Sequence, residues 1–224
     1  FISVSKNTMN DMMRYYKIPG EKITVLYNGY RSIFKEVAET DVPQKDYILY
    51  VARVEHPGKN HLNLIKAYEL MDKDLKNRYD LIFAGSLKER SSEVVEYVNR
   101  SECFKSVRFL GFVKSEDLPA LYKNASLFVF PSFYEGFGIP LIEAMAAGIP
   151  VSASDRSSLP EIGGCAAQYF DPDKPEEIKT VMESILTNEL KKKEMIEKGF
   201  QQIEKFDWTR HSDGIIRIYE EIHG

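Results

Sequence analysis

Two carboxylates flank a glycine-rich turn in the stretch PSFYEGFGIPLIEAMAAG, residues 131–148. Glu135 lies just before the turn, and Glu143 follows it eight positions later. Pro140 favours the first turn of a helix, where its missing N–H costs nothing, so a helix is predicted to begin directly after the glycines. The unpaired amides at such a helix start attract anions. Carboxylate, anion-binding turn and carboxylate would match a ligand with hydroxyls, then phosphates, then hydroxyls.

Two cations, Arg53 and Lys59, follow the apolar run YILYVA, residues 47–52. Their positive charges could balance a diphosphate. When the bond between a diphosphate and its substituent breaks, the leaving group gains another negative charge. Cations fixed beside it stabilise the transition state more than the ground state. A nucleotide-sugar carries its sugar, diphosphate and ribose in the predicted order.

The elements that would position these residues are short apolar runs that alternate with amphipathic stretches. Strands are predicted at 47–52, 80–85, 107–111, 126–132 and 149–154, and helices at 60–72, 90–100, 115–123 and 139–147. Strands that are apolar throughout, with helices between them, indicate a parallel sheet covered on both faces. The predicted fold class is therefore α/β, a doubly wound, Rossmann-like parallel sheet. Ligands of such folds bind at the carboxyl ends of the strands, where the cations and the glycine-rich turn lie.

The two ends of the chain have a different pattern. A first β-α-β unit is predicted from FISVS, a helical stretch at 6–17 and ITVLY, followed by a loose segment at 28–45. Three charged amphipathic helices are predicted near 175–187, 189–205 and 208–222, and Asp173 is interpreted as the N-cap of the first. A chain that begins at Phe1, directly with a strand, is expected to be part of a longer protein.

Composition excludes several classes of function. The 224 residues carry a net charge of −4, which is unfavourable for binding a nucleic-acid backbone. Cys103 and Cys165 lie far apart, as is usual for free thiols in a reducing compartment. No apolar run approaches the ~20 residues that a membrane span needs.

No metal site is predicted. The D-x-D pairs Asp72–Asp74 and Asp171–Asp173 are interpreted as a helix end and a helix cap. His56 and His61, five residues apart, do not share a helix face and are interpreted as loop residues.

A dinucleotide site is the main rival interpretation of the turn. The letters GFG at 136–138 could open a G-x-G-x-x-G motif. However, Leu141 occupies the third glycine position, Pro140 interrupts the motif, and Glu135 would have no role.

Several segments together resemble a known family. They are YVARVEHPGKNHLNLIKAY, LIFAGS, VRFLGFVKSEDLPALYKNASLFVFPSFYEGFGIPLIEAMAAGIPVSAS and LPEIGGCAAQYFDPDKPEEI. They are similar to the nucleotide-sugar-binding half of retaining GT-B glycosyltransferases, specifically the family 4 group, over roughly residues 47–222. Two glutamates eight apart are common, but this pair with GFGIP between them, after LFVFPS and downstream of ARVEHPGKN, is specific.

The resemblance implies a role for each candidate residue. Arg53 and Lys59 would bind the donor diphosphate, although they stand six apart, one more than in many relatives. The amides that would help them belong to Gly136, Phe137, Gly138 and Ile139.

The remaining roles concern the two ends of the donor. Glu135 would contact the donor sugar as a catalytic nucleophile or charge stabiliser, and Glu143 would accept hydrogen bonds from the ribose hydroxyls. Phe112 and Val113 fall where the nucleobase is held.

The resemblance also implies a domain organisation. Residues 1–30 would be the terminal piece of an acceptor-binding domain, 31–45 a linker, 46–206 the donor-binding domain and 207–224 a C-terminal helix. The implied activity is hexosyl transfer from a nucleotide-sugar to a glycan or lipid-linked acceptor, without cofactor or metal. The implied place is the cytoplasm, with peripheral association of the full-length protein at the inner face of the membrane. A non-catalytic nucleotide-sugar-binding scaffold is the alternative.

Overall fold

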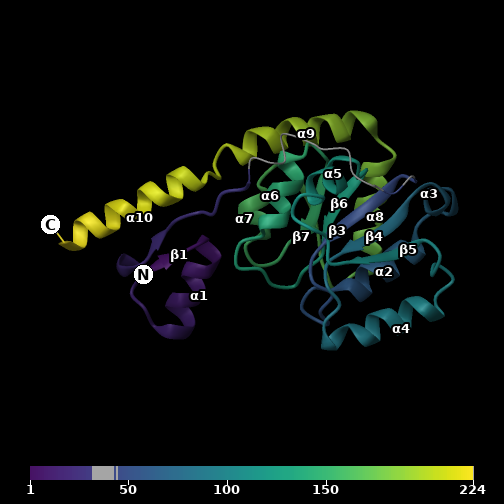
Figure 1. Cartoon of the computed structure of the whole chain (residues 1–224), viewed down its shortest axis with the longest axis horizontal. Coiled ribbons are helices and arrows are strands. Elements are labelled where there is room, and N and C mark those ends of the chain that lie inside the picture. The colour runs from purple at the N-terminus through teal and green to yellow at the C-terminus, as the bar shows by residue number, and fades with distance from the viewer. Residues whose placement is uncertain (32–42, 44, 224) are drawn as a thin grey trace.

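The structure, a computed structural model, describes residues 1–31, 43 and 45–223. Its centre is a six-stranded parallel sheet in the order β5-β4-β3-β6-β7-β8 (Figure 1). The strands are β3 (Tyr47–Val51), β4 (Asp80–Ala84), β5 (Val107–Gly111), β6 (Leu127–Phe130), β7 (Val151–Ser154) and β8 (Ala167–Phe170). In chain order this is the 3-2-1-4-5-6 arrangement of a doubly wound fold, so the predicted fold class is confirmed.

Helices cover both faces of this sheet. They are α2 (His61–Leu70), α3 (Lys73–Arg78), α4 (Ser92–Arg100), α5 (Leu118–Lys123), α6 (Ile139–Ala146), α7 (Leu159–Gly163), α8 (Pro175–Leu186) and α9 (Glu189–Ile203). A short 3-10 helix, η3 (Glu89–Ser91), leads into α4. The α2 helix packs against α8 and α4, and α6 packs against α9, α7 and α5.

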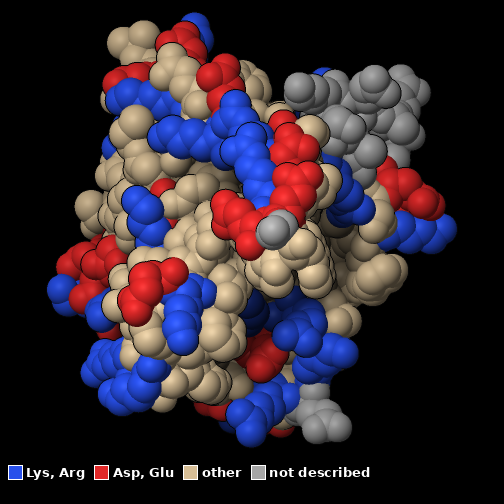
Figure 2. Space-filling model, turned by 90° about the vertical axis from the view of Figure 1, so that its left-hand side faces the viewer, with Lys and Arg blue, Asp and Glu red and all other residues tan. Residues whose placement is uncertain are grey.

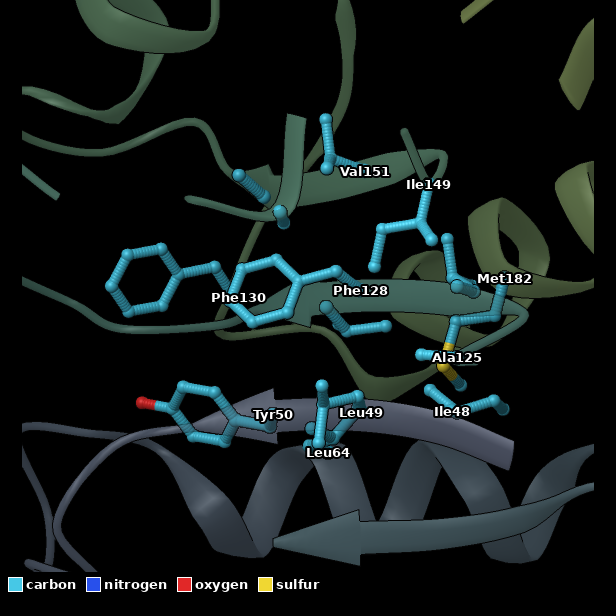
Figure 3. Packing of buried hydrophobic residues seen from close by; sticks show 14 of the residues in the cluster. Ile48, Leu49, Tyr50, Leu64, Ala125, Phe128, Phe130, Ile149, Val151 and Met182 are labelled. Carbon is cyan, nitrogen blue, oxygen red and sulfur yellow. The ribbon is translucent and has the colours of Figure 1, made fainter. Parts of the chain in front are cut away.

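The core lies between the central strands and these helices. All residues of β4, β6 and β7 are buried, as expected for parallel strands covered on both faces. Figure 3 shows Tyr50 and Leu49 of β3 beside Phe128 and Phe130 of β6, with α2 beneath them. Full burial of each such side chain contributes about 1.5–3 kcal/mol, so the centre of the sheet is a rigid support for the loops at its ends.

A smaller unit precedes the sheet. It consists of β1 (Ile2–Ser3), α1 (Lys6–Tyr16), η1 (Gly20–Lys22) and β2 (Thr24–Val25), with β1 and β2 paired in parallel. The last helix, α10 (Trp208–His223), runs from α9 toward this unit (Figure 1). Gly29, which follows this unit, packs directly on the start of α10, because a Cβ on it would collide with the Trp208 amide nitrogen.

Three elements were not predicted, namely α3, α7 and β8. Two local interpretations were wrong. His61 is not a loop residue, because it begins α2 and is fully buried. Asp173 is not a helix cap, because Lys174 occupies the N-cap position of α8 and the Asp173 carboxylate pairs with Arg156 at 3.2 Å.

Among the described residues, no helix combines the length and the apolar character that crossing a bilayer requires. The face that carries the N-terminal unit and the end of α10 has both charge signs interspersed (Figure 2). Such mixing is unlike the single-sign surface of a nucleic-acid-binding protein.

Candidate functional site

Two loops meet at the centre of the carboxyl edge of the sheet. The first follows β3, the second follows β6, and the strand order reverses between these two strands. The Phe133 N–H donates to the Gly58 carbonyl at 3.1 Å, and the Tyr50 hydroxyl donates to the Lys59 carbonyl at 2.9 Å. The residues of the two motifs therefore lie at the topological switch point of the sheet, the place where doubly wound folds bind ligands.

Lys59 and Glu135 form an ion pair at this switch point. The Lys59 Nζ and the Glu135 Oε1 are 2.7 Å apart, with the side chains 23% and 14% exposed. The structure thus brings together two residues that are 76 positions apart in the chain. A cation and a carboxylate in contact can exchange partners when a ligand arrives with a phosphate and a sugar.

Arg53 does not take part in this pair. Its guanidinium is 61% exposed and lies 3.5 Å from the Glu55 carboxylate, within the same loop. An exposed arginine on a loop retains the rotamer freedom needed to reach a bound phosphate.

The glycine-rich turn is held in place by hydroxyl groups. Ser158 Oγ lies 2.9 Å from the carbonyl oxygens of Glu135 and Phe137, and Ser157 Oγ accepts from the Glu135 amide at 2.9 Å. Gly138 is the N-cap of α6, with a φ of 104° that favours glycine. Because carbonyls of the turn are bound to hydroxyls, its peptide units are fixed at the start of α6. Pro140 has no N–H and the Leu141 N–H donates to the Gly138 carbonyl at 3.0 Å, so of the first three helical residues only Ile139 has an N–H that its own helix does not use.

Glu143 lies one turn inside α6, beside α5 rather than beside Glu135. It is 6% exposed, accepts a hydrogen bond from the Tyr122 hydroxyl at 3.2 Å and lies 3.8 Å from Arg31. Burial raises the pKa of the Glu143 carboxyl, and the contacts with Tyr122 and Arg31 oppose this shift. The two carboxylates of the motif therefore have separate partners.

The two predicted nucleobase residues follow β5, the edge strand of the sheet. Phe112 is 78% exposed and Val113 is half-buried. A large exposed ring of this kind can stack on a planar base.

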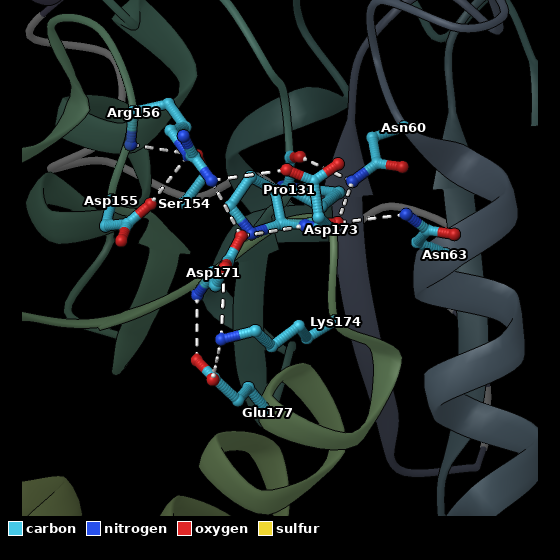
Figure 4. A network of polar contacts seen from close by, with 11 residues as sticks. Asn60, Asn63, Pro131, Ser154, Asp155, Arg156, Asp171, Asp173, Lys174 and Glu177 are labelled. Atoms are coloured by element: carbon cyan, nitrogen blue, oxygen red, sulfur yellow. Dashed lines mark hydrogen bonds and ion pairs between the residues drawn. The ribbon is translucent and has the colours of Figure 1, made fainter.

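A polar network that was not predicted lies beside the Lys59–Glu135 pair. The Asn60 side chain donates to the carbonyls of Pro131 and Pro172 at 3.0 and 2.8 Å, joining the start of α2 to the chain after β6 and β8. Arg156 bonds Asp171 at 2.9 Å in the same region (Figure 4). The Arg156 hydrogen bond is the main cause that lowers the pKa of Asp171 to about 2. The network ties together the loops that carry the site.

Serine and asparagine have no charge or spacing signal, which is why Ser157, Ser158 and Asn60 were missed. A positive φ was equally invisible: Ser157 has a φ of 52° and Asn60 a φ of 56°. Among the described residues, no group of three or more His, Cys, Asp or Glu side chains could hold a metal ion.

A separate hollow of about 430 Å³ lies between α2 and α4 and is lined by Glu69, Tyr97 and Arg100, among others. None of its lining residues belongs to the predicted site. The lining residues already pair with one another, because the Tyr97 hydroxyl donates to Glu69 at 2.7 Å and Arg100 lies 3.5 Å from the Glu96 carboxylate.

The sheet order and the two loops that meet where it reverses define a doubly wound α/β unit. The chain belongs to the family described as glycosyl transferases group 1, whose pattern matches residues 33–202.

Known proteins similar to the chain agree with this membership. O-antigen chain mannosyltransferase B of Escherichia coli is 33% identical over 228 residues, covering 98% of this chain and 60% of that protein. The chain therefore spans less than two thirds of this relative.

Two solved structures share the fold. The crystal structure of WaaG, a glycosyltransferase involved in lipopolysaccharide biosynthesis, matches with a TM-score of 0.81 at 17% identity, over 95% of this chain and 60% of that one. Anabaena Alr3699/HepE in complex with UDP-glucose matches with a TM-score of 0.84 at 18% identity, over 98% and 63%.

Proposed function

We propose that this chain is the donor-binding half of a retaining glycosyltransferase of the family 4 group. The enzyme would transfer a hexose from a nucleotide-sugar to a glycan or lipid-linked acceptor. The observation that carries the proposal is the Lys59–Glu135 pair at 2.7 Å, at the switch point of the sheet and next to the start of α6. Residues 46–206 would form the donor-binding domain, and residues 1–30 would belong to the acceptor side.

Each residue has a role in this proposal. Lys59, Arg53 and the amides of the turn hold the diphosphate, Glu143 and Phe112 hold the ribose and the base, and Glu135 faces the sugar. When the bond from the sugar to the phosphate oxygen breaks, its electron pair stays on that oxygen. The new negative charge then develops beside Lys59 and the positive end of α6, which favours the transition state. No metal is required for this stabilisation.

The relative from Escherichia coli supports mannose as the transferred sugar, since its name is that of a mannosyltransferase. The complex of HepE with UDP-glucose supports a nucleotide-sugar as the class of donor. The base is left to experiment. We also propose a cytoplasmic place, with peripheral contact to the inner face of the membrane where the acceptor is lipid-linked. The free thiols of Cys103 and Cys165 accord with a reducing compartment.

Calorimetry of this chain with UDP, GDP, ADP and TDP, with and without EDTA, tests the proposal. One nucleotide is expected to bind best, and EDTA should not change its affinity. Lys59→Ala should weaken binding about tenfold, as expected when one partner of a charged contact is removed. Lys123→Ala, which removes a charge from the exposed end of α5, is the matched control. Absence of binding to all four nucleotides would refute the proposal.

A further inference from the structure

A single carboxylate on α7 binds the amino end of α1. Glu161, in the first turn of α7, accepts hydrogen bonds from the amides of Lys6 at 2.7 Å and Asn7 at 3.1 Å. These are the first two N–H groups of α1, which have no partner within their own helix. The Tyr27 hydroxyl donates to the same carboxylate at 2.8 Å. Glu161 therefore joins three donors of the N-terminal unit to α7.

The same end of α1 touches the glycine-rich turn. Ser5, the N-cap of α1, has its Oγ 2.7 Å from the Gly136 carbonyl, and Thr8 Oγ1 donates to that carbonyl at 3.0 Å. One turn further along, Asp11 accepts from the Tyr134 hydroxyl at 2.7 Å. The α1 helix is thus bonded to the residues on both sides of Glu135.

The Glu161 contacts are strong ones for their kind. A carboxylate that accepts from backbone amides forms charge-assisted hydrogen bonds, and the positive end of the helix dipole adds to the attraction. Burial first, and then the hydrogen bond to Glu161 and its negative charge, together raise the pKa of Tyr27 to about 12, so Tyr27 remains a donor at neutral pH. The Tyr27 ring also packs 6.2 Å from the Phe137 ring, in the turn itself.

We propose that Glu161 is a positioning residue that anchors the amino end of α1, so that the N-terminal unit meets the Gly136 turn in one fixed position. This inference rests on the proposed function in one respect. The surface of α1 near Asp11 and Tyr134 would face the acceptor, and Glu161 would hold that surface at a set distance from Glu135. Glu161 itself touches neither donor nor acceptor.

The substitution Glu161→Gln tests this role with little change in size. Its amide group keeps one acceptor oxygen and turns the other into a donor that faces the N–H groups of α1, so the negative charge and at least one of the amide contacts are expected to be lost. Glu176→Gln removes the same charge from an exposed position in the first turn of α8 and is the matched control. Tyr27→Phe removes only one of the three donors and is a second, milder variant.

Hydrogen exchange and kinetics give separate readouts. In this chain, Glu161→Gln should speed amide exchange at Lys6 and Asn7 about tenfold, Tyr27→Phe should speed it less, and Glu176→Gln should leave it unchanged. In the full-length enzyme, Glu161→Gln should lower kcat about tenfold and leave the KM for the donor within about twofold.

Unchanged exchange at Lys6 and Asn7 in both Glu161→Gln and Tyr27→Phe would overturn the proposal. So would an equal loss in kcat and donor affinity, which would place Glu161 in donor binding. The proposed function fails in a different way, because the unmodified chain would then bind no nucleotide while the exchange experiment still reports on the anchor.

Discussion

Replacing Glu135 by Gln is expected to tighten the binding of a nucleoside diphosphate while it abolishes sugar transfer. In the structure, Lys59 is engaged by the Glu135 carboxylate at 2.7 Å. A phosphate that binds Lys59 must therefore compete with a carboxylate and must also approach that carboxylate's negative charge. The neutral amide of Gln removes both obstacles and keeps the size of the side chain.

The size of the effect follows from the geometry. Two unit charges at this separation attract by about 6 kcal/mol at an effective dielectric of 20. Most of that attraction is offset, because the pair is partly solvated and the freed lysine is rehydrated. A net change of about 1–2 kcal/mol remains, which corresponds to a factor of about 5–30 in affinity.

Calorimetry with the nucleotide that binds best provides the measurement. The control is Lys59→Met, alone and combined with Glu135→Gln. In the Lys59→Met background the second change should tighten binding by less than about twofold, because the competition has already been removed. Equal or weaker binding by Glu135→Gln alone would show that Lys59 does not bind the diphosphate, and the reasoning would then be wrong.

Three further substitutions test other parts of the structure. His61 is fully buried, and burial is the main cause that lowers its pKa from 6.5 to about 3. The unfolded chain therefore binds a proton there at a higher pH than the folded chain, so this group should lower the free energy of unfolding by about 1.4 kcal/mol per pH unit as pH falls from 6.5 toward 3. Urea denaturation at pH 7.5 and 5 should show this slope, and His61→Leu should remove it; a slope that persists would contradict the assignment. Ser158→Ala should lower the free energy of unfolding by about 1 kcal/mol and should also weaken nucleotide binding. An unchanged affinity would show that this hydroxyl does not contribute to ligand binding by the turn. Gly138→Ala should lower the free energy of unfolding by about 1–3 kcal/mol, because the φ of Gly138 is 104° and the added Cβ would lie 2.9 Å from Leu159 Cδ2. Thermal denaturation measures this loss, and Gly58→Ala is the control because the space around Gly58 is open. Equal stability of the two variants would refute the strain at Gly138.

The central sheet could be predicted because each of its first five strands is a short apolar run between helical stretches. The sixth, β8 (Ala167–Phe170), lies at the edge and only Phe170 is buried, so its hydrophobic signal is weak. The α7 helix spans five residues and contains a proline. A helix this short does not show a hydrophobic period, so the sequence pattern could not reveal it. Fold class thus follows from the buried centre, and the missed elements lie where burial is partial or the element is short.

The site was predicted in part. The sequence predicted that Lys59 and Glu135 lie on neighbouring loops, with Lys59 binding the diphosphate and Glu135 contacting the sugar. Their direct pairing depends on the hydrogen bond that joins these loops at Gly58, and no local pattern encodes that contact. The interpretation of Asp173 as a helix cap was wrong for the opposite reason. Its local pattern is that of a cap, yet Arg156 provides a tertiary partner of opposite charge, and that interaction prevails.

The neutral side chains around the turn shape the electrostatic field of the site together with its cations. A peptide unit has a negative carbonyl and a positive amide, so a hydroxyl that fixes the carbonyl also fixes the direction of the amide dipole. Ser5 and Thr8 fix the Gly136 carbonyl, and Ser158 fixes the carbonyls on either side of it. Dipoles oriented before a ligand arrives need no reorganisation when charge develops, which is the condition for electrostatic stabilisation of a transition state. Because Ser5 and Thr8 lie at the amino end of α1, the direction of the dipole at the turn depends on where the N-terminal unit sits. In the role proposed for it, Glu161 would thereby link the placement of that unit to the electrostatic field around Glu135.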